Sequence, residues 1–305
     1  MRRYIIKRIL QAMVTILLIM VIIFFLSRAI GDPAVLFITE DAGEEELEIL
    51  REKFGIDKPI WVQFVRFFAS AARGDFGESF KWDEPALPLV LSRFPATLEL
   101  AACAVLFSSL FGLSVGMITA LKRDSWLDRF GQSLAVFGQA VPNFWLGLML
   151  ILLFGVYLKW LPISGREELS NVIMPALTLS AFTTASVTRL TRSSMLDVLG
   201  SEYIKMVRIK GAPERIVILK HGLRNALIPI LTLISLQFGY LLGGSVIVET
   251  VFAWPGVGRL AIEAFFRRDF PVIQSVVFFM SFVFVTINLL VDILYAYIDP
   301  RIRYG

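Results

Sequence analysis

The chain has 305 residues, of which 56% are hydrophobic and 18% are charged, and its mean hydropathy is +0.71. A soluble domain usually contains about 45–50% apolar residues, so much of this apolar surface must face lipid. A single cysteine, Cys103, excludes an intramolecular disulfide, and a single histidine, His221, excludes a multi-histidine metal centre within the chain. The net charge of +4 is small, and its distribution indicates a membrane rather than a nucleic-acid partner.

Six segments are apolar and long enough to cross a bilayer, which takes about 20 residues as a helix. They are residues 9–26, 100–121, 134–158, 172–187, 226–248 and 272–298. The fourth is short and rich in Thr and Ser, so we expect it to pack against other helices or to line a path. Basic residues precede the first span, as in a signal peptide, but its apolar run is too long and no cleavage site follows. Residues 1–27 are therefore predicted to be a retained anchor helix.

The distribution of charge orients these spans, because cytoplasmic loops are rich in Lys and Arg. The N-terminal tail carries four cations and no acid, and the loop 189–225 has eight basic against three acidic residues. Segment 28–93 has eight basic against thirteen acidic residues. The sequence thus predicts an all-α polytopic membrane protein with six transmembrane helices and cytoplasmic N and C termini. Segment 28–96 would lie outside, and residues 299–305 would form a cytoplasmic tail.

The external segment 28–96 contains two stretches with helical spacing of apolar residues. The first begins at Asp41, a candidate N-cap, and continues to Phe54; the second follows Pro59 and ends before Gly74. We interpret them as a small amphipathic cap on the outer face, with a solvated loop as the alternative.

The cytoplasmic loop 189–225 contains a short basic helix, predicted from Glu202 to Lys210. Ser201 is a candidate N-cap, and Gly211 fits the left-handed position that follows a helix. Pro213 can then occupy the first turn of a second helix that leads into the fifth span. A helix this short has little core of its own, so it needs a partner surface in the cytoplasm or at lipid headgroups.

Several motifs of the chain resemble those of dipeptide/oligopeptide ABC importer permeases. They are Arg189 to Gly211, Leu219 to Pro229, Gly31-Asp-Pro33, Phe94-Pro-Ala-Thr-Leu-Glu-Leu100, Asn143-Phe-Trp-Leu-Gly147, Val248 to Gly256 and Asn288 to Arg303. The resemblance covers nearly the whole chain, and residues 219–304 look especially like glutathione-type members. It implies a type I ABC importer permease fold, with residues 97–298 as the transmembrane domain, in a bacterial inner membrane. It also implies three kinds of partner: a second homologous permease subunit, two ABC ATPase subunits and an external solute-binding protein.

The resemblance assigns contact with the ATPase to the helix of the 189–225 loop. The residues concerned are Ser201, Glu202, Tyr203, Lys205, Met206, Arg208, Lys210 and Gly211. The wider superfamily carries Glu-Ala-Ala, three residues and Gly here, whereas this chain has Lys205-Met206-Val207 ahead of Gly211. The resemblance therefore implies the role of the loop and not its individual contacts.

The chain has no Gly-Lys-Ser or Gly-Lys-Thr, so it cannot hold ATP phosphates in a Walker A loop. ATP and Mg are expected in the partner ATPase subunits, and we expect no cofactor on this chain and no enzymatic activity of its own. The basic loop could also bind anionic membrane lipid.

Polar residues inside the apolar spans are candidates for the solute path, with helix packing as the alternative. They are Gln139 and Asn143 of the third span and Thr232, Ser235 and Gln237 of the fifth. Asp292 in the sixth span is either a proton or solute site or a structural group paired with a helix dipole, Asn288 or an Arg. We favour the structural interpretation, because an ATP-driven pump needs no proton relay. His221, which lies among cations, is also expected to be structural.

Two other functions fit a multi-pass chain. A secondary transporter would usually show inverted repeats or broken helices at matching positions, and the sequence shows no internal repeat. A receptor or scaffold would use the basic loop to recruit a signalling partner. The resemblance favours an importer of di- or oligopeptides or of glutathione, and it leaves nickel complexes, opines and oligosaccharides open.

Overall fold

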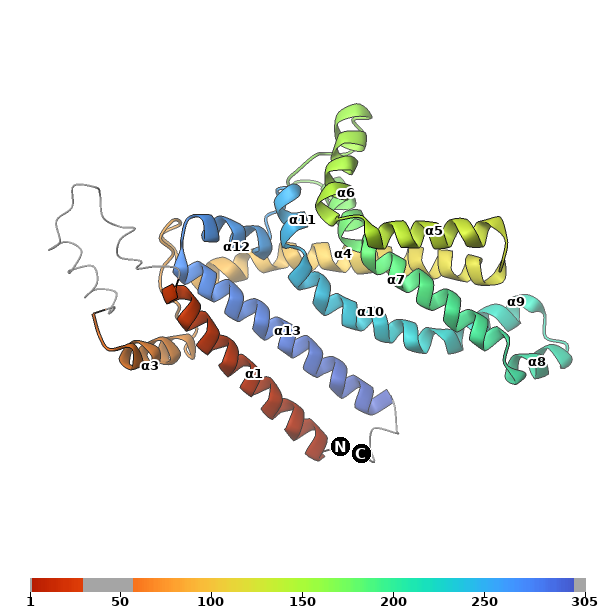
Figure 1. Cartoon of the computed structure of the whole chain (residues 1–305), viewed down its shortest axis with the longest axis horizontal. Coiled ribbons are helices and arrows are strands. Elements are labelled where there is room, and N and C mark those ends of the chain that lie inside the picture. Colours follow the sequence, from red (N-terminus) through yellow and green to blue (C-terminus); the bar gives the residue numbers. More distant parts are fainter. Residues whose placement is uncertain (1, 30–56, 299–305) are drawn as a thin grey trace. The chain divides into compact units, whose positions relative to one another are not determined.

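The structure is a computed structural model that describes residues 2–29 and 57–298 (Figure 1). In these residues all regular secondary structure is helical, apart from an isolated bridge between Glu78 and Pro85. The longer helices are α1 (Arg2–Ala29), α3 (Ile60–Ala71), α4 (Ala86–Leu121), α5 (Trp126–Ala140), α7 (Ile173–Leu199), α10 (Arg224–Gly244), α12 (Val257–Phe266) and α13 (Phe270–Ile298). The shorter ones are α6 (Asn143–Leu150), α8 (Glu202–Ile209), α9 (Glu214–Ile216) and α11 (Val246–Val251). Two π-helical segments, Ile151–Tyr157 and Val217–Leu223, and a 3-10 turn, Leu169–Val172, complete the set.

Within the described residues, four helical segments are long and apolar enough to cross a membrane. They are Ile5–Leu26, Ala86–Leu121, Glu214–Gly244 and Phe270–Leu290, and they coincide with the first, second, fifth and sixth predicted spans. α7 covers the fourth predicted span but is not among them, in keeping with its many hydroxyl side chains.

The apolar segment 134–158, predicted as the third span, is sharply bent. The chain bends by 108° between α5 and the helical segment Asn143–Tyr157. Proline at 142 has no N–H to donate and disfavours the helical conformation in the residue before it. Val141 accordingly has an extended backbone, with φ −79° and ψ 127°. Counted as one span, this bent pair of helices brings the candidate spans of the described residues to five.

The chain divides into two compact units, Met1–Pro95 with Gly256–Gly305, and Ala96–Pro255. In the first unit α1 lies beside α13, and α12 also packs against α13 (Figure 1). α3 confirms the second predicted amphipathic helix, and its Phe64 and Phe67 place their rings 5.2 and 5.7 Å from that of Phe24 on α1. The other predicted external helix, 41–54, and the tail 299–305 lie outside the described residues.

A buried carboxylate holds the connection before α4 in this unit. Asp269 accepts a hydrogen bond from Ser79 Oγ at 2.6 Å and from the backbone N–H groups of Phe80 and Lys81 at 3.1 and 3.3 Å. Three donors compensate the cost of burying the charge. Asp269 thereby ties together segments that are about 190 residues apart.

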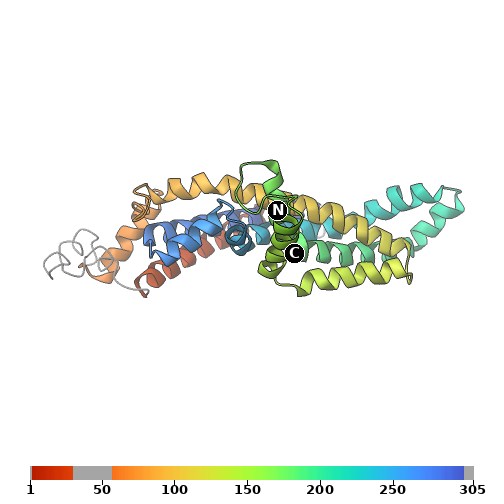
Figure 2. The same ribbon diagram turned by 90° about the horizontal axis from the view of Figure 1, so that it is seen from above.

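In the second unit α7 lies between α5 and α10 and also contacts α6 and α11. α4 approaches α7 closely through Gly112 and Gly116. A Cβ added at Gly116 would lie 2.5 Å from Thr191 Cβ and 2.6 Å from the Thr188 carbonyl oxygen. Small residues four apart permit this kind of contact between membrane helices. At one end of the unit, α8 and α9 lie together in both views (Figure 1, Figure 2).

Candidate functional site

The predicted helix of the 189–225 loop is present as α8, one residue shorter than expected at its C-terminus. Ser201 is its N-cap and accepts a long hydrogen bond, 3.5 Å, from the N–H of Ile204. Gly211 follows the C-cap residue Lys210 with φ +77°, in the left-handed region. Both end signals read from the sequence are confirmed.

α8 is fixed to the rest of the unit by one buried side chain and by polar contacts. Ile204 is fully buried, and the Tyr203 hydroxyl lies 2.6 Å from Nδ1 of His221. Arg208 donates to both carboxylate oxygens of Glu214, at 2.7 and 3.2 Å. These bonds raise the pKa of the Arg208 guanidinium above its ordinary value, so it stays charged. The loop therefore has a defined shape although it lies outside the core.

One side of α8 is apolar and uncovered within the described residues. Tyr203, Met206 and Ile209 are 51%, 56% and 78% exposed. A spacing of three residues places them along one side of the helix. A contiguous apolar surface of this kind, flanked by charges such as Lys205, is typical of an interaction site.

α8 is followed by a non-helical turn over residues 210–213 and then by a helical segment that leads into the fifth predicted span. Pro213 is the N-cap of α9 and so precedes the helix, whereas the sequence placed it in the first turn. From Glu214 the helical path continues to Gly244, with π-helical hydrogen bonding over Val217–Leu223. π-helical turns are rare and are frequently found at functional sites. The ion pair between Arg208 and Glu214 links the two sides of the turn.

Polar side chains between α5 and α7 line a groove of about 490 Å³. Gln139, predicted as a path residue, donates from Nε2 to Ser186 Oγ at 3.1 Å and accepts from Arg189 Nη1 at 2.8 Å. Next to them, Arg192 and Asp128 form a two-pronged ion pair with both bonds at 2.7 Å. Of the residues that line this groove, only Gln139 was predicted as a path residue, although Gln132 lies seven residues before it on α5 and also lines the groove.

The other predicted path residues do not line this groove. Asn143, half-buried, begins α6 on the other side of the bend from Gln139. On α10, the hydroxyls of Thr232 and Ser235 donate to carbonyl oxygens of their own helix, at 3.1 and 2.9 Å. At about 100° per residue, Gln237 lies on a nearly opposite side of α10. The five residues therefore do not share one face, and their role in a path stays a prediction.

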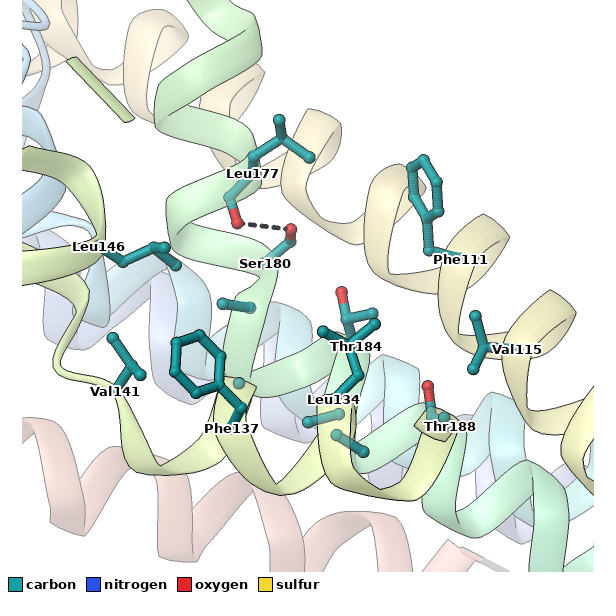
Figure 3. A pocket seen from close by; sticks show the side chains of 15 residues that line it. Phe111, Val115, Leu134, Phe137, Val141, Leu146, Leu177, Ser180, Thr184 and Thr188 are labelled. Atoms are coloured by element: carbon teal, nitrogen blue, oxygen red, sulfur yellow. Dashed lines mark hydrogen bonds between the residues drawn. The ribbon is translucent and has the colours of Figure 1, made fainter. Parts of the chain in front are cut away.

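A second cavity, of about 300 Å³, lies among α4, α5 and α7 (Figure 3). Its walls are mainly apolar, with Phe111, Leu134 and Phe137 among them. The hydroxyl of Ser180, which faces it, is bonded to the Leu177 carbonyl oxygen at 3.0 Å. A charged solute would lose its hydration here without new partners, so this cavity is not suited to hold one.

Two motifs that the sequence analysis recognised separately meet in the second unit. Thr97 Oγ1 and Ser245 Oγ each donate to Oε1 of Glu249, at 2.8 Å, and all three side chains are buried. Trp254 donates from Nε1 to the Ala96 carbonyl oxygen at 2.8 Å. The motif around Glu249 therefore connects α4 to α11. The sequence alone did not indicate that this motif would bind residues of α4.

The loop before α7 is held by an ion pair. Arg166 donates from Nε to Oε2 of Glu99 at 2.9 Å, and its Nη2 contacts the same oxygen. Glu99, which lies within α4, thus ties this loop to α4. For Asp292 the structure describes the helix but not the side chain, so its role stays open.

Among the side chains that the structure describes, no three His, Cys, Asp or Glu residues are close enough to hold a metal ion. The candidate functional features are therefore the exposed helix α8, the polar groove between α5 and α7, and the apolar candidate spans.

Comparison with known proteins identifies the family. Residues 112–304 match the family described as binding-protein-dependent transport system inner membrane component, and residues 1–101 match its N-terminal family. The chain belongs to this family. It is an inner-membrane, multi-pass permease subunit of an ABC transport system and not an enzyme by itself. Membership also decides against the secondary transporter and the receptor, and it implies ATPase and binding-protein partners.

Curated relatives match over the full length. The glutathione transport system permease protein GsiC of Pectobacterium atrosepticum is 45% identical over 305 residues, which cover 100% of both chains. The protein of the same name from Escherichia coli (strain K12) is 43% identical with the same coverage.

Among solved structures, a chain of the MetNI methionine ABC transporter in inward-facing conformations matches with a TM-score of 0.58 and 18% identity. The match covers 69% of this chain and 96% of that one, and it supports the fold.

Proposed function

We propose that the chain forms half of the translocation path of an ABC importer for glutathione or a related di- or oligopeptide. The observation that carries this proposal is the 43–45% identity, over the whole length of both chains, to glutathione permeases. Nickel complexes, opines and oligosaccharides remain less favoured solutes. The external solute-binding protein makes the first selection, and a second, homologous permease subunit completes the path.

The membrane topology we propose has six spans with both termini in the cytoplasm. α1, α4, the bent pair α5–α6, α7, α10 and α13 would be the spans. The charge asymmetry supports this orientation, since loop 189–225 carries eight basic residues against three acidic ones. In this arrangement residues 1–27 anchor the chain, 28–96 lie outside, 97–298 form the transmembrane domain and 299–305 form a cytoplasmic tail.

We further propose that α8 docks on a partner ATPase and transmits its movement. Three features support this role. The apolar side formed by Tyr203, Met206 and Ile209 is exposed within the described residues, and the buried Ile204 fixes the helix from behind. After the turn at 210–213, one helical segment from Glu214 to Gly244 leads into α10. ATP and Mg would be bound by the ATPase subunits.

Site-directed crosslinking tests the docking surface. In a Cys103→Ser background, single cysteines at positions 203, 206 and 209 should crosslink to the ATPase in the assembled transporter. A cysteine at position 204, on the buried side of the same helix, is the matched control and should not react. Failure of all three exposed positions, or equal crosslinking at 204, would show that α8 is not the docking element.

Co-purification and energy source test the importer. A tagged chain purified from its own membrane should bring down a second permease and two ATPase subunits. Transport in vesicles should stop when ATP is removed and persist when ion gradients are collapsed. Purification of the chain without any ATPase, or transport that depends on an ion gradient, would refute the proposal.

A further inference from the structure

A stripe of polar side chains runs along the contact between α5 and α7. Spacings of three, four and seven residues keep them on one face of each helix. The stripe consists of Gln132 and Gln139 on α5 and of Ser186, Arg189, Arg192 and Ser193 on α7. They line the groove of about 490 Å³ described above, here named the α5–α7 groove. Placing polar and charged side chains between the helices of a membrane bundle costs free energy, so a stripe of this kind is a candidate functional site.

The α5–α7 groove carries one positive charge that no acid neutralises. Arg192 is neutralised by Asp128, which accepts both of its hydrogen bonds. Arg189 instead donates to the neutral carboxamide of Gln139. None of the ion pairs formed by the described residues includes Arg189. The guanidinium of Arg189 is thus exposed to the groove with donors to spare.

The same groove has a buried donor that lacks a partner. Nε2 of Gln132 is inaccessible to solvent and makes no hydrogen bond to any residue that the structure describes. An unsatisfied buried donor is unfavourable, but a solute in the groove does not reach this atom where it lies. The cation that the groove presents is therefore Arg189, because the carboxylate of Asp128 is already used by Arg192.

We propose that the α5–α7 groove is a carboxylate subsite on the path of the transported solute, with Arg189 as its charged anchor. This inference rests on the proposed function. A guanidinium binds a carboxylate through two parallel N–H···O bonds, and a small peptide always has a free α-carboxylate to offer. A carboxylate would take over the bonds that Arg189 now makes to Gln139.

The groove lies toward the end of α7 that the charge pattern places near the cytoplasm, so the solute would reach it late in transport. Arg189 lies about 24 Å from the first residue of α7, at about 1.5 Å per residue. The end of α7 beyond it leads into the α8 loop, which the charge pattern places in the cytoplasm. A single cation in a partly open groove holds a carboxylate and still permits its release.

Uptake by the complete reconstituted transporter, with its binding protein saturated, tests the subsite. Arg189→Gln should lower glutathione uptake roughly ten- to hundredfold, which corresponds to one lost charge-assisted pair. ATP hydrolysis stimulated by the binding protein should change by no more than about twofold. Arg189→Lys keeps the charge but loses the two parallel donors, so its uptake should lie between that of the unaltered transporter and that of Arg189→Gln. Arg129→Gln removes the same charge from an exposed position on α5 and should leave uptake unchanged.

A second variant reports on the site without removing the cation. Gln139→Glu places a permanent carboxylate beside Arg189 and should lower uptake as far as Arg189→Gln does, because it competes with the solute. Wild-type uptake by both Arg189→Gln and Gln139→Glu would overturn the subsite and leave the proposed function intact. A defect that disappears in vesicles without anionic lipid would assign Arg189 to headgroups instead. Absence of glutathione and peptide uptake by the unaltered transporter would contradict both proposals.

Discussion

Gly211 is the position where a single substitution tests the coupling loop most sharply. Its φ of +77° lies in the left-handed region, and a Cβ built on it meets no heavy atom within 4 Å. A side chain there is therefore opposed by the backbone conformation and not by a clash. For an ordinary L-residue that conformation costs about 1–2 kcal/mol, and more for a β-branched one.

We predict that Gly211→Ala reduces coupling and that Gly211→Val reduces it further. A cost of about 1–2 kcal/mol shifts the population of the docked loop conformation by a factor of about 5–30. The assay is the number of solute molecules taken up per ATP hydrolysed in proteoliposomes, together with recovery of the ATPases on purification. Ligand binding by the external binding protein should not change.

Gly243→Val is the matched control for this series. Gly243 also has no heavy atom within 4 Å of a built Cβ, but its φ is not positive, so valine fits the helix there. Unchanged coupling in Gly211→Val, with the ATPases still attached, would refute the coupling role of this loop. Equal loss in Gly243→Val would show that the assay reports general damage.

Three further predictions concern stability and the outer segment. Gly116→Ala should lower the free energy of unfolding of the purified complex by about 1–3 kcal/mol, because the Cβ of the new alanine would overlap Thr191. Gly243→Ala should leave it unchanged, because a Cβ there meets no heavy atom within 4 Å. Asp128→Asn should lower the free energy of unfolding by about 3 kcal/mol, because it leaves the charge of Arg192 unpaired; thermal unfolding measures the loss. An equal loss in Arg123→Gln, which changes an exposed charge, would contradict this explanation. Deletion of residues 41–54 should impair transport while the ATPases stay attached, and wild-type uptake would show the segment to be dispensable.

The ends of helices were predictable because they depend on local chemistry. Ser201 and Gly211 mark the ends of α8 through a side-chain cap and a positive φ, and both signals lie within a few residues of the helix. Four long spans were predictable from hydropathy for a similar reason. The bend at Pro142 was missed because the apolar run over 134–158 suggested one continuous span, although proline already carried the local signal.

Contacts between distant segments were not predictable from one sequence. Thr97 and Glu249 each belong to a recognised motif, but their pairing depends on how α4 and α11 pack. The α5–α7 groove was only partly foreseen. Gln139 was selected because it is a polar residue within an apolar span, whereas Arg189 was assigned to a cytoplasmic loop by its charge. In the structure Arg189 lies on α7, and its side chain donates a hydrogen bond to Gln139 on α5.

Uptake of labelled glutathione into proteoliposomes is the most direct test of the central claim. The complete transporter, with both permeases, the ATPases and the binding protein, should accumulate glutathione only when ATP is present. The chain reconstituted alone should be inert. Robust uptake by this chain without partners, or uptake by the complete assembly that needs an ion gradient and no ATP, would contradict the account.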